Sequence, residues 1–151
     1  MRPFGIPPAP LLLGLAGLIP FLWGAATALS PGLWRWGADL LGQRFVAPFV
    51  GLSYGTVILS FMSGVTWGFA TRADARAAPA LYGLSVLPAL WAFFFVGGGP
   101  TSAATFLVAG FIGLLGIDWT AQRLGLAPSW WMALRLILTA GVVLSLLPLI
   151  L

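Results

Sequence analysis

The chain contains no cysteine and no histidine, and only three of its 151 residues are acidic. These absences exclude disulfides, thiolate chemistry, and zinc or haem sites with Cys or His ligands. The three carboxylates, Asp39, Asp74 and Asp118, leave little for acid–base catalysis or for metal binding. We therefore expect no catalytic residues, no metal site and no cofactor, and we do not expect an enzyme.

Charge of either sign is also scarce. Charged residues make up 7% of the chain and hydrophobic residues 60%, with a mean hydropathy of +1.04. A soluble domain carries about 25% charged residues. A surface this apolar is stable in contact with lipid tails but not in contact with water. Each helix that crosses the membrane needs roughly 20 residues. The composition predicts an all-α integral membrane protein without a separate soluble domain.

Apolar runs divide the chain into a single transmembrane domain, residues 1–151, which we predict to be a five-span helical bundle. The spans are expected at about 10–29, 46–71, 78–96, 101–119 and 130–151. Pro20 and Pro88 lie inside two of these runs and predict kinks.

The first run has a second interpretation as a secretory signal peptide. Arg2 precedes the apolar stretch, and Ala26-Thr27-Ala28 resembles a cleavage site. Prolines at positions 3, 7, 8 and 10 are unusual in such a leader and favour a retained span.

The segment after the first span has the pattern of a short amphipathic helix at residues 33–45. Ser30 followed by Pro31 is typical of a helix start. Arg35, Asp39 and Gln43 recur at helical spacing opposite an apolar face, and tryptophans 34 and 36 suit the headgroup level. We predict a helix lying in the membrane interface, with an ordinary connecting loop as the alternative.

Arginine placement predicts the orientation. With five spans, one side of the membrane carries Arg2, Arg72, Arg76 and Arg123, and the other carries Arg35 and Arg44. The positive-inside rule then places the N-terminus in the cytoplasm, or the mitochondrial matrix, and the C-terminus outside. Three tryptophans, at positions 119, 130 and 131, would form an aromatic belt at the inner interface. No dense basic run exists, so we expect contact with lipid headgroups and no nucleic-acid partner.

Small residues in the second span predict a close-packing groove. They are spaced by four within two groups: Gly51 and Gly55, then Ser60, Gly64 and Gly68. The groove either packs inside the bundle or docks a partner helix, from a second copy or from a larger membrane complex. Tyr54, Ser63, Thr66 and Trp67 share this span with the groove. They either bond across helices or line a polar path.

One acidic and one basic residue fall near the expected inner ends of spans four and five. An unpaired charge at mid-membrane costs about 2.5–3.5 kcal/mol and less near the ends. Asp118 and Arg135 are therefore predicted to pair across the helical hairpin. The pair is either structural or part of an anion-handling site centred on Arg135.

Several motifs resemble the family called domain of unknown function 3429, which is related to the mitochondrial transmembrane protein 69. The motifs are Leu13 to Phe21, Tyr54 to Gly68, Ser85 to Ala89, and Leu134 to Thr139. Thr66 stands where the family pattern leads us to expect His or Arg before the tryptophan. The resemblance covers most of the chain and implies a small protein of the bacterial inner membrane, in which the orientation predicted from the arginines would make the C-terminus periplasmic. It implies no established activity.

These observations favour a non-enzymatic accessory or assembly protein that packs against itself or against a larger membrane complex. The alternative is a small transporter or channel for an ion or small solute, with Asp118, Arg135 and the hydroxyls of the second span along its path. A third hypothesis is a lipid- or tetrapyrrole-binding membrane protein.

Overall fold

The computed structural model describes residues 3–151, and every regular element within that range is helical. The elements are η1 (Pro3–Gly5), α1 (Pro8–Ala16), α2 (Ile19–Leu29), α3 (Pro31–Leu41), η2 (Gln43–Phe45), α4 (Phe49–Ala70), α5 (Ala78–Phe95), α6 (Pro100–Arg123), α7 (Trp131–Leu146) and η3 (Leu147–Leu149). Five segments of this part of the chain are long and apolar enough to cross a membrane. The predicted all-α bundle of five spans is confirmed.

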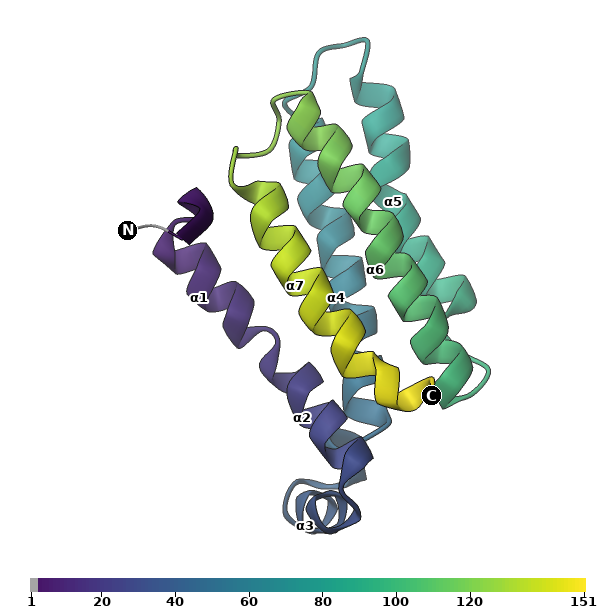
Figure 1. Cartoon of the computed structure of the whole chain (residues 1–151). Helices are drawn as coiled ribbons and strands as arrows, with labels where there is room; N and C mark the ends of the chain where they lie inside the picture. Colours follow the sequence, from purple (N-terminus) through teal and green to yellow (C-terminus); the bar gives the residue numbers. More distant parts are fainter. Residues whose placement is uncertain (1–2) are drawn as a thin grey trace.

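Helices α4 to α7 run side by side, and α1 with α2 forms the remaining span (Figure 1). Helix α4 contacts α2, α5 and α6, and α7 contacts α2 and α6. The core lies between them and includes the fully buried side chains of Phe21, Leu59, Leu107 and Phe111. Most of the remaining surface of the five spans is not covered by other parts of the chain, as expected for helices in contact with lipid tails.

The first span bends where its two helices meet, between Ala16 and Ile19. Pro20 has no N–H to donate to the Ala16 carbonyl. Leu18 N donates to Leu15 O at 3.0 Å, so the last turn of α1 tightens. The kink predicted from Pro20 is therefore present. Helix α2 places Phe21 in the core, so this segment is an integral part of the bundle.

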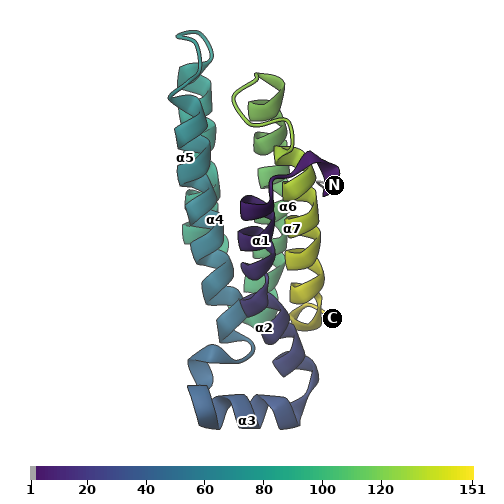
Figure 2. The same ribbon diagram turned by 90° about the vertical axis from the view of Figure 1, so that its left-hand side faces the viewer.

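Helix α3 crosses the end of the bundle at a steep angle to the spans (Figure 2). The Ser30 hydroxyl accepts a hydrogen bond from Leu33 N at 3.3 Å, so the predicted cap is confirmed. The helix ends at Leu41, earlier than predicted, because Gly42 has φ +94° and residues 43–45 form the separate turn η2. Two indole N–H groups connect α2 and α3 to the segment that precedes α4, because Trp23 donates a hydrogen bond to Phe45 O and Trp34 donates one to Ala47 O.

The two ends of the bundle differ in charge. The α4–α5 and α6–α7 connections lie at one end, whereas α3, the α5–α6 turn and the C-terminus lie at the other (Figure 1). The first end carries Arg72, Arg76 and Arg123, while Arg2 lies outside the described residues. Arg72 donates a hydrogen bond to Leu126 O, which joins the two connections.

Two predicted span boundaries need correction. Helix α4 begins at Phe49 and not at 46, because residues 46–48 complete the turn after η2. Helix α6 continues to Arg123, past the predicted end at 119. Asp118 is therefore inside the helix and about 7.5 Å from its end, at 1.5 Å per residue.

Candidate functional site at a buried ion pair

The predicted partners Asp118 and Arg135 meet between α6 and α7. Arg135 Nε lies 2.7 Å from Asp118 Oδ2, with 5% and 0% of the two side chains exposed. The other carboxylate oxygen, Oδ1, accepts a hydrogen bond from Trp131 Nε1 at 2.9 Å. Trp131 is thus a partner of the pair, and not only a belt residue as the sequence analysis expected. The cost of removing both charged groups from water is offset by the attraction between them.

The pair leaves one side of the arginine without a partner. Within the described residues, two buried side-chain atoms lack a hydrogen bond, Arg135 Nη2 and Thr139 Oγ1. The two residues are one turn apart on α7, so they lie on the same face of the helix. Both line a crevice of about 280 Å³. Buried polar atoms are usually satisfied, so two unpartnered atoms on residues that line the same crevice make it the candidate ligand site.

The crevice forms where the first span bends. Its walls come from α1, α2, α4, α6 and α7, and its lining is mostly apolar. Gly14 lets α1 pack closely against α7 at this wall, because a Cβ there would lie 3.0 Å from Leu138 Cδ1. Irregular backbone at membrane depth is tolerated where it lines a cavity, and discontinuous helices mark the binding sites of several transporters.

Of the four predicted lining residues, the structure brings only Tyr54 to this crevice. Ser63 Oγ accepts a hydrogen bond from Ala89 N at 2.9 Å, next to Pro88 in α5. Thr66 Oγ1 donates to Met62 O within α4, and the Trp67 ring packs against the Tyr82 ring at a tilt of 60°, with centroids 4.7 Å apart. These four side chains therefore do not line a common path.

The predicted small-residue face also divides in two. Gly51 and Gly55 are buried inside the bundle, and a Cβ at Gly55 would lie only 2.9 Å from Leu107 Cδ1. Gly64 and Gly68 are exposed, with no atom within 4 Å of an added Cβ. Ser60 is half-buried beside them, and its hydroxyl donates to Thr56 O at 2.8 Å. The expectation of one continuous face is therefore wrong.

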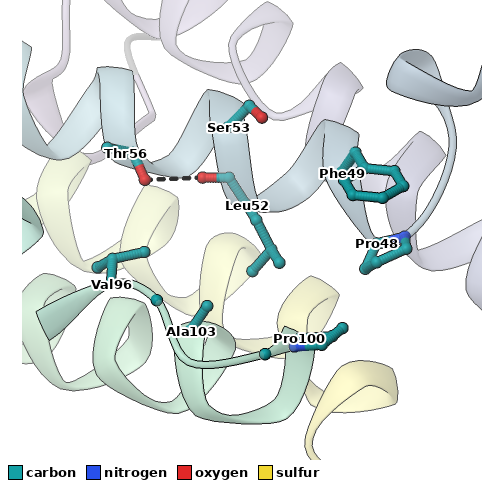
Figure 3. A pocket seen from close by; sticks show the side chains of 10 residues that line it. Pro48, Phe49, Leu52, Ser53, Thr56, Val96, Pro100 and Ala103 are labelled. Carbon is teal, nitrogen blue, oxygen red and sulfur yellow. Dashed lines mark hydrogen bonds between the residues drawn. The ribbon is translucent and has the colours of Figure 1, made fainter.

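A separate hollow of about 340 Å³ lies between the start of α4 and the α5–α6 turn (Figure 3). Leu52, Val96, Pro100 and Ala103 give it an apolar lining. The Thr56 hydroxyl donates to Leu52 O at 2.9 Å, so its hydrogen goes to its own helix. With no charged side chain and no unpartnered buried group in its lining, this hollow is a weaker candidate than the crevice beside Arg135.

Sequence reasoning found the ion pair but missed Thr139 and Gly17 as parts of the same site. Arg135-x-x-x-Thr139 places two hydrogen-bonding groups on one helical face in a run that is otherwise apolar. That spacing is the signal that could have drawn attention to Thr139. The contribution of Gly17 depends on the packing of α1 against α7 and α4, which the sequence does not specify.

Together these features define a polytopic helical membrane protein with a buried polar site and no soluble domain among its described residues. A family model described as "Protein of unknown function (DUF3429)" matches residues 6–151, and the chain belongs to this family. The chain is also similar to Transmembrane protein 69 of Xenopus tropicalis, with 37% identity over 145 residues, or 93% of this chain and 53% of that protein. It thus spans about half the length of this relative. No solved structure matches the chain.

Proposed function

We propose that this multi-pass protein is a non-enzymatic accessory or assembly protein that binds a helix of another membrane protein through the outer face of α4. The outer face consists of Ser60, Gly64 and Gly68. The observation that carries the proposal is the open space over Gly64 and Gly68, where nothing lies within 4 Å of an added Cβ. Small residues at this spacing let two helix backbones approach closely, and close packing drives helix association in lipid.

The chemistry of this face suits an apolar helix. The Ser60 hydroxyl donates to Thr56 O, and the Thr56 hydroxyl donates to Leu52 O. Because both hydroxyls donate within α4, the face needs no polar partner. The same bonds weigh against the transporter hypothesis, which needs these hydroxyls along a solute path.

The proposal includes a location in the bacterial inner membrane, with the N-terminus in the cytoplasm and the C-terminus in the periplasm. The excess of arginine at the end formed by the 71–77 and 124–130 connections supports this orientation. At that end the Arg123 guanidinium lies 4.6 Å from the centre of the Trp119 ring, an arrangement that suits a headgroup region.

The test is native mass spectrometry of the protein extracted gently from its own membrane, without overexpression. We expect stoichiometric recovery with a larger complex. Gly64→Leu should abolish that recovery without changing the thermal unfolding of the isolated chain. Gly116→Leu is the matched control, because Gly116 is an exposed glycine of α6 that also has open space around it.

Three other outcomes are informative. A homo-oligomer that Gly64→Leu dissociates would identify the partner as a second copy of the chain. A monomer in both mild detergent and native membranes would refute the proposal. Flux of ions or small solutes through liposomes that contain such a monomer would favour the transporter instead.

A further inference from the structure

The crevice beside the ion pair has a donor surface that nothing in the described chain uses. Arg135 Nη2 and Thr139 Oγ1 are buried and unpartnered, and both residues line it. Arg135 is 4% exposed and Thr139 is 4% exposed, so neither group is solvated from outside. An unsatisfied buried donor costs about 1–3 kcal/mol, a cost that a bound acceptor would remove.

The charge state of the site selects the kind of acceptor. Asp118 already neutralises Arg135 through the 2.7 Å contact between Oδ2 and Nε. A second anion would therefore enter a buried site whose net charge is zero, against a desolvation penalty of several kcal/mol. A neutral oxygen acceptor satisfies the same N–H and O–H donors without that penalty. A carbonyl oxygen has two lone pairs, so it can accept from both groups.

The depth of the site limits the source of that carbonyl. Arg135 is four residues into α7, so it lies about 6 Å along the helix from its start, and Thr139 lies about 6 Å deeper. A hydrocarbon core is about 30 Å thick, so the donors lie within it and below the headgroups. The ligand must therefore be soluble in the hydrocarbon core, including the part that contains its carbonyl group.

We propose that this crevice binds a neutral, lipid-soluble molecule whose carbonyl oxygen accepts hydrogen bonds from Arg135 and Thr139. Its apolar body lies against Leu13, Leu18, Phe21, Ile58 and Phe61, which line the rest of the space. The Tyr54 hydroxyl stands at the bend of the first span, 3.8 Å from the position of a Cβ on Gly17, and faces the same space. This binding is independent of the proposed association through α4.

The test measures retention of isotopically labelled probes by the full chain in nanodiscs, relative to empty nanodiscs. A decyl-substituted benzoquinone and dioleoylglycerol supply the carbonyl from two different sources, and hexadecane is the probe without a carbonyl. We expect saturable retention of at least one carbonyl probe and none of hexadecane. The probe that is retained identifies the source as a quinone or an acyl ester. We also expect the carbonyl stretching band of the retained probe to move to lower frequency, as hydrogen bonding requires.

Thr139→Val removes the hydroxyl at nearly constant shape and should weaken retention about fivefold, the effect of one typical hydrogen bond. Thr66→Val is the matched control, since Thr66 is also buried but bonds to Met62 O away from the crevice. It should leave retention within twofold of the wild type. Equal retention of hexadecane, no saturable retention of either carbonyl probe, or equal weakening by Thr66→Val would overturn the proposal.

Discussion

Neutralising one member of the Asp118–Arg135 pair should destabilise the bundle more than neutralising both. In Asp118→Asn the compensating charge is lost, and the single amide oxygen can replace only one of the two carboxylate oxygens that accept from Arg135 Nε and Trp131 Nε1. In Arg135→Met the carboxylate keeps its bond from Trp131 but loses its cation. The double variant contains neither buried charge.

The magnitude follows from the burial of the pair. Asp118 is 1% exposed and Arg135 is 4% exposed, so solvent screens neither charge. Breaking a buried pair by removing one partner costs about 3–5 kcal/mol in soluble proteins. A lone charge at the centre of a span costs about 2.5–3.5 kcal/mol and less toward the ends. We expect each single substitution to lower the free energy of unfolding by about 3 kcal/mol, and the double variant to lose less than either.

The assay is equilibrium unfolding in mixed micelles with increasing dodecyl sulfate, followed by tryptophan fluorescence and far-UV circular dichroism. The coupling energy of the double-mutant cycle should exceed about 3 kcal/mol, because the double variant loses less than either single variant. Arg123→Met is the control for loss of an exposed arginine at the same end of the bundle, and it should change stability by under about 1 kcal/mol. Additive single effects, or single effects as small as that of Arg123→Met, would show that the pair does not stabilise the fold.

Two further predictions concern packing and orientation. A Cβ at Gly110 would lie 2.7 Å from Leu59 Cδ2 and 2.8 Å from Trp91 Cδ1. The Trp91 ring is held by its bond to Phe106 O, so Gly110→Ala should cost about 1–3 kcal/mol in the same unfolding assay. Gly113→Ala, with open space, should cost nothing, and equal effects would contradict this reasoning. Because the chain has no cysteine, a single Cys at position 73 or 43 reports its side of the membrane. In intact bacterial cells, an impermeant maleimide should label position 43 and leave position 73 unlabelled, and the reverse pattern would invert the proposed orientation.

The spans were predictable because composition and length alone require apolar segments of about 20 residues. The boundaries of the spans were less predictable, because they depend on the backbone conformation of single residues. Gly42 ends α3 through a positive φ, and α4 starts only after Pro48. The end of α6 was placed too early because the apolar run ends at 119, whereas the helix continues through polar residues to Arg123.

The ion pair was predictable for a simple energetic reason: opposite charges on neighbouring apolar spans have few other ways to be satisfied. The unpartnered hydroxyl of Thr139 was not predictable, because threonine hydroxyls in membrane helices usually donate to a backbone carbonyl one turn earlier in the helix. Thr56 and Thr66 do so, donating to Leu52 O and Met62 O. Thr139 looks the same in sequence but faces a crevice created by the bend of a span more than a hundred residues away.

The division of the small residues of α4 follows from helix geometry and was readable from the sequence. Steps of four residues keep side chains on one stripe, but Gly55 and Ser60 are five apart. Five residues rotate the position by about 140° around the helix, since each residue turns it by 100°. The glycines therefore form two stripes on different faces. The stripe of Gly51 and Gly55 lets the side chains of Leu107 and Phe21 lie close to the α4 backbone at Gly55. It therefore determines how closely the first span and α6 pack against α4. The second stripe lies outside this core, with nothing within 4 Å of a Cβ at Gly64 or Gly68, and it is the stripe that we propose to contact a helix of another protein.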